Sequence, residues 1–199
     1  MSGSDLYLMR HGETQANAQG RYQGRLDSDL TDRGLAQAQA VSALLADRLR
    51  GRAVRILVSP LGRAQKTAAI LAAALDRPRP VQTLDTLTEV SMGACEGLTR
   101  AEIAQHWPNI RKGRARREWM FHTPGGETLD VAFARASAAY AQARASDEPT
   151  VIVSHAILGR LIRAAHGQQP VLEALALEAP QEVAFQLGDG GHEHALTAL

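Results

Sequence analysis

The chain is short of cysteine and of long apolar runs, and each shortage excludes a class of protein. Its 199 residues include one cysteine, Cys95, so no disulfide can form within the chain and no zinc–thiolate cluster is expected. No apolar run approaches the ~20 residues that a membrane-spanning helix needs. Residues 1–5 lack the basic and apolar regions of a signal peptide. We therefore expect a cytoplasmic protein that has no membrane partner.

Net charge is also nearly absent. The 22 lysine and arginine residues almost cancel the 21 aspartate and glutamate residues, which leaves a formal charge of +1. A near-neutral chain argues against a protein built to coat nucleic acid or a membrane surface. There is no Gly-x-x-x-x-Gly-Lys phosphate loop and no aspartate-rich metal cluster, so we expect neither a metal nor another cofactor. With 45% hydrophobic and 22% charged residues, residues 1–199 fit a single domain.

The sequence does contain an alternation of strand and helix patterns. Apolar runs predict strands at residues 6–9, 54–58, 81–90 and 151–153. Apolar stripes at helical spacing predict helices at residues 32–49, 61–75, 127–143 and 156–165, with shorter helices at 99–107 and 172–177. Two further runs, at 182–187 and 194–199, flank a glycine-rich turn and predict an antiparallel hairpin. This order predicts an α/β fold with a mostly parallel sheet.

Chemically active residues follow four of these runs. Arg10 and His11 end the first, Arg63 lies in the first turn of the helix after the second, Glu89 ends the third, and His155 ends the fourth. In parallel sheets the carboxyl ends of the strands meet at one edge, where ligands bind. We therefore expect these five side chains to lie together.

Two arginines and two histidines at one edge predict a phosphate site. Guanidinium groups match phosphate oxygens, and the same cations keep a neighbouring imidazole neutral and nucleophilic. Phosphoryl transfer without a metal needs a protein nucleophile, and a histidine can serve. Glu89 is the candidate that protonates the leaving alkoxide. Nearby cations also favour ionised Glu89, so activity is expected to rise toward acid pH unless burial offsets their effect.

Five segments carry recognisable motifs in a fixed order, and together they cover nearly the whole chain. The first is Arg10-His11-Gly12-Glu13-Thr14, followed by Asn17, Arg21, Gln23-Gly24, Leu30-Thr31, Gly34 and Gln37-Ala38. The others are Ser59-Pro60-Leu61-Gly62-Arg63-Ala64-Gln65-Lys66-Thr67-Ala68, Glu89 to Gly97, Pro124-Gly125-Gly126-Glu127, and Val151-Ile152-Val153-Ser154-His155. They resemble the histidine phosphatase superfamily, in its phosphoglycerate mutase-like branch. The resemblance implies a three-layer α/β/α sandwich, with a mostly parallel central sheet and an antiparallel edge strand.

The resemblance also implies roles for individual residues. His11 would carry the phosphoryl group as phosphohistidine, and Glu89 would donate a proton and later activate water. Arg10, Arg63 and His155 would hold the phosphoryl group. The remaining matches are positions that contact the phosphate or the substrate: Asn17, Gln23, Gly24 and Ala156. Ala156 replaces a glycine that is usual in the family, so its methyl group would narrow the pocket while its backbone N–H is kept.

Three functions stay open on these grounds. Hydrolysis of a small phosphorylated metabolite is favoured, because the family's mutases carry a longer, water-excluding segment after the Glu89 position and residues 98–124 are short here. The alternatives are a cofactor-dependent phosphoglycerate mutase and a non-catalytic protein that binds a phosphorylated ligand.

Residues 98–124 are expected to form a lid that sets specificity. Their basic stretch at 111–117 would either bind a second anionic group of the substrate or form a solvated face. Nucleic acid is not an expected partner, because the stretch is short and the overall charge is near neutral. A strand at the edge of the sheet could pair two chains into a homodimer.

Overall fold

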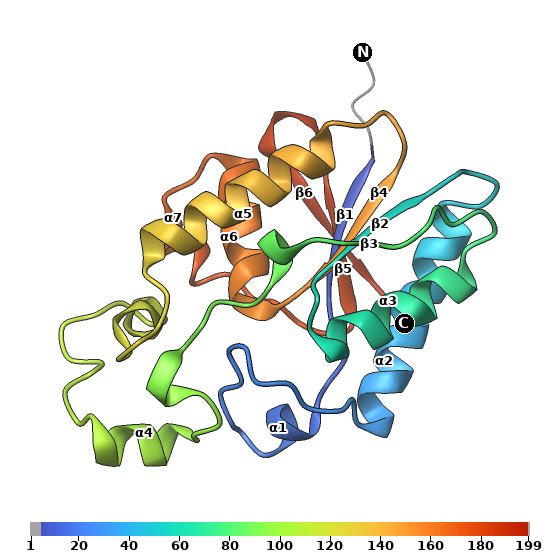
Figure 1. Cartoon of the computed structure of the whole chain (residues 1–199). Helices are drawn as coiled ribbons and strands as arrows, with labels where there is room; N and C mark the ends of the chain where they lie inside the picture. Colours follow the sequence, from blue (N-terminus) through green and yellow to red (C-terminus); the bar gives the residue numbers. More distant parts are fainter. Residues whose placement is uncertain (1–4, 199) are drawn as a thin grey trace.

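Six strands form one sheet at the centre of the computed structural model, which describes residues 5–198 (Figure 1). Their order across the sheet is β3-β2-β4-β1-β5-β6. They are β1 (Leu6–Arg10), β2 (Arg55–Val58), β3 (Gln82–Thr83), β4 (Thr150–Ser154), β5 (Val183–Leu187) and β6 (Glu193–Thr197). The pairings from β3 to β1 are parallel, and those of β5 and β6 are antiparallel. The predicted mostly parallel sheet is confirmed, and its antiparallel edge is a pair of strands.

Helices cover both faces of the sheet, as the predicted three layers require. Alternate strand residues point to opposite sides, so β1 places Leu6 and Leu8 in one core and Tyr7 and Met9 in the other. The first core is closed by α5 (Leu129–Arg144) and α6 (Ala156–Gly167). The second is closed by α2 (Asp32–Arg48) and α3 (Gly62–Ala74). Each layer therefore rests on its own face of the same strands.

The shorter helices lie in the connections. They are α1 (Gln15–Ala18), α4 (Arg100–His106) and α7 (Val171–Ala174), with 3-10 turns at Asp85–Leu87, Gly93–Cys95, Glu118–His122 and Asp189–Gly191. Thr31 and Thr99 cap α2 and α4 through their side chains. The helix predicted from Glu127 begins at Leu129 instead, because Thr128 is the residue that caps it.

The predicted strand at 81–90 is wrong over most of its length. β3 has two residues, and a 3-10 turn over Asp85–Leu87 follows it. The hydroxyl of Thr88 donates to the backbone carbonyl of Asp85, which ties the chain into that turn. Glu89 consequently lies in a loop after the turn rather than at the end of a strand.

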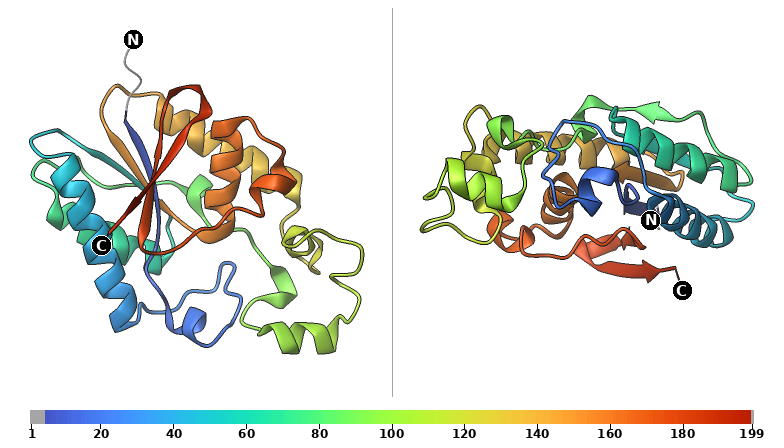
Figure 2. Two further views of the ribbon diagram at one scale, coloured as in Figure 1. Left: turned by 180° about the vertical axis from the view of Figure 1, so that it is seen from behind. Right: turned by 90° about the horizontal axis from the view of Figure 1, so that it is seen from below.

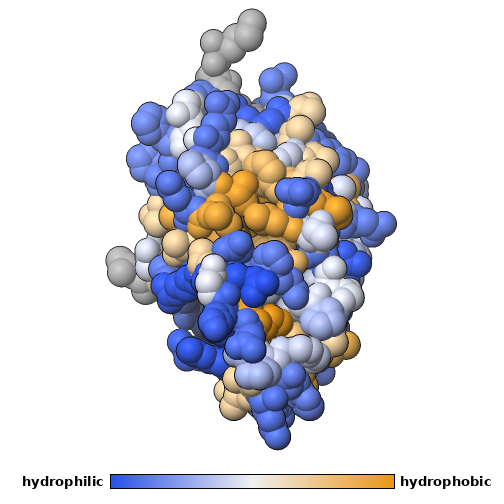
Figure 3. Space-filling model, turned by 90° about the vertical axis from the view of Figure 1, so that its left-hand side faces the viewer, coloured by the Kyte–Doolittle hydropathy of each residue, from blue (hydrophilic) through white to orange (hydrophobic). Residues whose placement is uncertain are grey.

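The segment 98–124, which the sequence predicts to be a lid, lies at one end of the molecule, away from α2 and α3 (Figure 2, right). It is built from α4, a series of turns and the 3-10 turn Glu118–His122, whose side chains Trp119, Met120 and Phe121 are buried. The side of the molecule that carries it shows a hydrophilic area below an apolar patch (Figure 3).

The structure also bears on the expectations about membrane spans and cysteine. No helix within residues 5–198 is long and apolar enough to cross a membrane. Cys95 is buried. The signal-peptide argument rests largely on residues 1–4, which lie outside the described residues, as does the last residue of the strand predicted at 194–199.

Candidate active site

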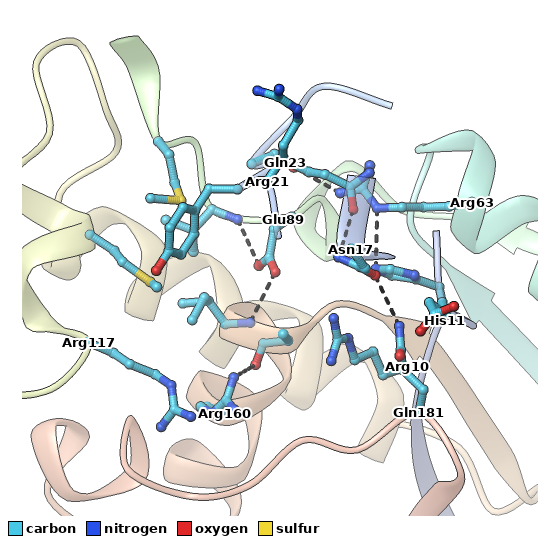
Figure 4. A pocket seen from close by; sticks show the side chains of 18 of the residues that line it. Arg10, His11, Asn17, Arg21, Gln23, Arg63, Glu89, Arg117, Arg160 and Gln181 are labelled. Carbon is cyan, nitrogen blue, oxygen red and sulfur yellow. Dashed lines mark hydrogen bonds between the residues drawn. The ribbon is translucent and has the colours of Figure 1, made fainter. Parts of the chain in front are cut away.

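A pocket of about 470 Å³ opens at the carboxyl ends of β1 and β4. Its lining includes four of the five strand-end residues of the sequence analysis: Arg10, His11, Arg63 and Glu89. The fifth, His155, is buried beside them, and its ring centre is 5.1 Å from that of His11. Figure 4 shows His11, Arg10 and Arg63 on one side of the pocket, with Arg117 and Arg160 on the other. The fold therefore brings the five residues together, as predicted.

His11 is held one residue beyond β1. Its backbone N–H donates to the carbonyl of Ser154 at 3.0 Å, which extends the β1–β4 ladder. Nδ1 lies 2.7 Å from the carbonyl of Gly12, and since a carbonyl can only accept, Nδ1 carries the proton. Nε2 is then the nitrogen with the lone pair, and Arg63 Nε donates to it at 3.3 Å. His11 thus presents a neutral, oriented nucleophilic nitrogen.

Burial is the main reason that the pKa of His11 lies well below its ordinary value. The nearby charges of Arg10 and Arg63 lower that pKa further, and the bond to Gly12 opposes them. The pKa of His155 is also well below normal, first because of burial and then because of His11, Arg63 and Arg10. Both imidazoles are therefore neutral at physiological pH.

Arg63 is fixed by oxygens on one loop. Nη2 donates to the carbonyl of Gly24 and Nη1 to that of Leu26, each at 2.8 Å. Asp27 accepts from Nη1 at 3.1 Å and also from the backbone N–H groups of Gly62 and Arg63, which start α3. The side chain of Arg63 is 1% exposed, against 41% for Asp27. One carboxylate thus links the start of α3 to the orientation of its buried guanidinium.

His155 is positioned from the other side by Ser59. The Ser59 hydroxyl lies 2.7 Å from His155 Nε2 and also accepts from the backbone N–H of Leu61 at 3.3 Å. Ser59 continues the β2–β4 ladder through its N–H to Val153. His155 itself is the N-cap residue of α6. A serine at the end of one strand therefore orients the imidazole at the end of the next.

Three buried nitrogens around the site have no partner within the described chain: Arg10 Nε, Gln23 Nε2 and His155 Nδ1. Buried polar groups are normally hydrogen-bonded, so each needs a ligand acceptor or water. Arg10 and Gln23 can act only as donors through these atoms, and His155 Nδ1 does so when Nε2 accepts from Ser59. The site is built to receive oxygens that accept several hydrogen bonds, as a phosphoryl group does.

Glu89 is buried at the N-terminus of α6. Its oxygens accept from the backbone N–H groups of Val90, Ile157 and Leu158 at 2.9–3.0 Å. The segment before it is held by Arg135, which donates to the carbonyls of Thr86 and Thr88. Glu89 thus reaches the pocket because a helix terminus and a distant arginine hold its loop, which no strand pattern could indicate.

The predicted substrate-contact residues also line the pocket. Asn17 and Gln23 are joined through Asn17 Nδ2 and Gln23 Oε1 at 3.2 Å, and Thr14 donates to the same oxygen at 2.8 Å. Gly24 has a φ of +53°, and a Cβ there would meet the side chain of Glu96. Ala156 lines the pocket as the first residue of α6.

The sequence reasoning missed several residues that shape this site. Asp27 and Ser59 orient Arg63 and His155 through side-chain bonds to groups distant in sequence, and Gln181 donates to Asn17 Oδ1 at 3.1 Å from the loop before β5. Arg160, just over one turn into α6, donates to the carbonyls of Ala156 and Leu177 and lines the pocket. Ser59 is part of the second motif, and Asp27 lies between Gly24 and Leu30 of the first, so their position was the available signal.

The sequence matches one protein family over most of its length. The sequence profile described as histidine phosphatase superfamily (branch 1) matches residues 6–184. A glucosyl-3-phosphoglycerate phosphatase of Mycobacterium tuberculosis is 35% identical over 190 residues, which cover 89% of this chain and 81% of that protein. A 2,3-bisphosphoglycerate-dependent phosphoglycerate mutase of Methylocella silvestris is 36% identical over 138 residues, or 69% of this chain and 66% of that protein.

Two other comparisons bear on how far the likeness extends. A bifunctional protein of Mycobacterium tuberculosis is 40% identical over 129 residues, which cover 63% of this chain. The match spans 33% of the length of that longer protein. The solved structure of a mycobacterial glucosyl-3-phosphoglycerate phosphatase with VO3 superposes with a TM-score of 0.79 at 29% identity, covering 98% of each chain.

Proposed function

Because the chain belongs to the histidine phosphatase superfamily (branch 1), we propose that it hydrolyses the phosphomonoester of a small metabolite through a phosphohistidine on His11. The observation that carries this proposal is the set of three unpartnered buried nitrogens beside a neutral imidazole. Phosphatase-named relatives, such as the glucosyl-3-phosphoglycerate phosphatase of Mycobacterium tuberculosis, support the same reaction class.

In the first step, the lone pair of His11 Nε2 forms a bond to phosphorus while the bond from phosphorus to the ester oxygen breaks. Arg63 Nε, which donates to that lone pair in the free site, turns to a phosphoryl oxygen. Arg10 Nε, Gln23 Nε2 and His155 Nδ1 donate to the other oxygens and stabilise the charge that spreads over them. Glu89 gives its proton to the leaving alkoxide, which departs as the alcohol.

In the second step, a water molecule attacks phosphorus and its proton passes to the Glu89 carboxylate. The bond from phosphorus to nitrogen breaks, and the electron pair returns to His11 Nε2. The products of the cycle are an alcohol and inorganic phosphate. We propose that no metal takes part, since arginines and neutral imidazoles supply the donors that the phosphoryl oxygens need.

Glu89 must be protonated in the first step. In the free site its oxygens accept from three backbone N–H groups. We therefore keep the expectation that turnover rises toward acid pH.

We also propose a cytoplasmic location, for which a single reduced, buried cysteine is the support.

A cofactor-dependent phosphoglycerate mutase is the second candidate, favoured by the 36% identity to such an enzyme. Both reactions share the phosphohistidine and differ in whether a bound sugar acid or water accepts the phosphoryl group. The short lid of residues 98–124 favours water as the acceptor.

The proposal is tested with p-nitrophenyl phosphate in the presence of EDTA. We expect phosphate release that chelation leaves unchanged, and an acid-labile phosphohistidine in quenched samples. His11→Ala should remove both the turnover and the label. Activity that disappears with EDTA, or a fully active His11→Ala variant, would disprove the mechanism. Interconversion of 3- and 2-phosphoglycerate with little phosphate release would instead select the mutase.

A further inference from the structure

The loop that follows His11 is packed directly against the first turn of α2. A Cβ on Gly12 would lie 2.1 Å from the carbonyl oxygen of Gly34, and a Cβ on Gly34 would lie 2.0 Å from the carbonyl oxygen of Glu13. Neither position can carry a side chain unless the facing backbone moves. This close approach places the peptide group between Gly12 and Glu13 against α2, a helix whose residues do not line the catalytic pocket.

Both ends of that peptide group are hydrogen-bonded. Its carbonyl, which belongs to Gly12, accepts from Nδ1 of His11 at 2.7 Å. Its N–H, which belongs to Glu13, donates to Oε1 of Gln37 at 2.8 Å. Gln37 follows Gly34 by about one turn of α2 and is 6% exposed. A buried side chain behind the pocket therefore holds the peptide group whose carbonyl holds the nucleophile.

Glu182 determines which way the amide of Gln37 faces. Its carboxylate accepts from Gln37 Nε2 at 2.5 Å. An ionised carboxylate can only accept and the N–H of Glu13 can only donate, so a single orientation of the amide serves both neighbours. Because Glu182 stands immediately before β5, the amide is fixed between two elements that lie far apart in the sequence.

The tautomer of His11 decides whether this imidazole can attack phosphorus. With the proton on Nδ1, the lone pair is on Nε2, where Arg63 Nε donates to it at 3.3 Å. If the carbonyl of Gly12 turned away, the Nδ1 proton would lose its acceptor in a buried place, which disfavours this tautomer. The competing tautomer carries its proton on Nε2 and has no lone pair there for the reaction.

We propose that Gln37, oriented by Glu182, is a positioning residue for phosphoryl transfer. It holds the Gly12–Glu13 peptide group so that His11 stays protonated on Nδ1 and presents the lone pair of Nε2. Gln37 does not line the catalytic pocket, so it acts through the peptide group and not by touching the substrate. This inference rests on the proposed function, since Nε2 of His11 is taken to be the nucleophile.

The kinetic test replaces the amide by an apolar side chain of similar size. Gln37→Leu removes both hydrogen bonds, and we expect kcat for p-nitrophenyl phosphate to fall about tenfold or more. KM should change by less than about twofold, because the groups that bind the phosphoryl oxygens are kept. Gln39→Leu alters an exposed glutamine of the same helix and is the matched control, for which wild-type values are expected. An unchanged kcat in Gln37→Leu would overturn the proposal.

A spectroscopic test separates positioning from a general loss of structure. Long-range ¹H–¹⁵N correlation spectra of the imidazoles report which ring nitrogen carries the proton, and His11→Gln identifies the His11 signals by their absence. We expect the Nδ1 tautomer in the wild type and in Gln39→Leu, and a substantial share of the Nε2 tautomer in Gln37→Leu. If His11 kept the Nδ1 tautomer in Gln37→Leu, the proposal would be wrong even where activity fell.

An exchange of the two partners tests the role of Glu182 and does not depend on the fold of Gln37→Leu. Gln37→Glu alone sets two carboxylates against each other, and we expect it to lower kcat. Adding Glu182→Gln restores a donor opposite an acceptor, while the carboxylate at position 37 still accepts from the N–H of Glu13. The double variant should recover about half or more of the lost kcat and the Nδ1 tautomer. Without such recovery, Glu182 would not orient residue 37.

Failure of the underlying function gives a different result. If the wild type releases no phosphate from any phosphomonoester, the proposed hydrolysis is wrong, and the tautomer spectra alone decide about Gln37. An Nδ1 tautomer that is present in the wild type and depleted in Gln37→Leu would keep the positioning role. The same tautomer in both proteins would overturn it.

Discussion

The two arginines beside His11, Arg10 and Arg63, donate mainly to uncharged oxygens. Arg63 donates to two backbone carbonyls, and Arg10 donates to the carbonyl of Ala179 at 3.0 Å. Carbonyl partners fix the guanidinium planes but leave the positive charge to a ligand. A buried cation without a full counterion costs stability, so such a site is expected where function requires an anion.

Asp27 differs from these carbonyl partners because it is a charged partner of Arg63. Asp27→Asn keeps the shape of the side chain but removes its charge and one of its two acceptor oxygens, so either Arg63 or the start of α3 loses a bond. We expect kcat/KM for p-nitrophenyl phosphate to fall about tenfold to a hundredfold and vanadate inhibition to weaken. Steady-state kinetics measures both.

Asp29→Asn is the matched control for this change. It lies on the same loop and pairs with the exposed Lys66 instead of a site residue. Wild-type kinetics are expected for it. If Asp27→Asn behaved like this control, Asp27 would have no part in orienting Arg63.

At the scale of elements, the loop that carries Glu89 depends on contacts from α5. Arg135 reaches from that helix to the carbonyls of Thr86 and Thr88, and its guanidinium is paired with Glu127 at 2.8 Å. Partial burial disfavours ionised Glu127, yet the bond and charge of Arg135 outweigh it and lower its pKa. A partly buried ion pair thus connects the Pro124-Gly125-Gly126-Glu127 turn to the position of Glu89.

Arg135→Lys is expected to impair proton donation in particular. A lysine keeps the charge but cannot serve Glu127 and two carbonyls with one fork. Hydrolysis of alkyl phosphates, which need a proton on the leaving oxygen, should fall at least tenfold more than hydrolysis of p-nitrophenyl phosphate, as it should in Glu89→Gln. Equal losses on both substrates would indicate general loosening of the fold. Arg48→Lys, on α2 and away from the pocket, provides the comparison.

The strands and helices that carry the site were predictable where one local pattern decided them. β1, β4, α2 and α6 have apolar runs or stripes with clear ends. The segment 81–90 was mispredicted because its loose alternation imitates a strand. What holds that segment is Arg135, a residue from another element. The roles of Asp27 and Ser59 were not predicted for the same reason, since their partners become neighbours only when the chain has folded.

For the molecule as a whole, a near-zero net charge conceals a strong separation of charge. Positive groups concentrate around His11 and again in a neighbouring cavity, where carboxylates are scarce. The arginines that line this second cavity are Arg100, Arg111, Arg114, Arg116 and Arg117. Elsewhere, two exposed arginines are examples of pairing with acids: Arg79 with Glu148 and Arg50 with Asp47. Total composition therefore says little about the ligand, whereas the local concentration of arginines favours an anion.

Stability of the whole chain should fall as the solution is acidified, because His11 and His155 are buried in neutral form. Their pKa values in the folded protein lie well below the ordinary 6.5, to which unfolding returns them. Between these values the unfolded chain binds more protons than the native chain, so the free energy of unfolding decreases as pH drops below about 6.5. Each imidazole contributes at most about 1.4 kcal/mol per pH unit within that window.

The melting temperature, followed from about pH 7 to about pH 5, should decline less steeply in His155→Gln than in the wild type or in the control His106→Gln, whose side chain is exposed. Equal slopes in all three proteins would mean that the folded site accepts these protons, and His11 would then lose its lone pair under the mildly acidic conditions in which Glu89 is expected to work best.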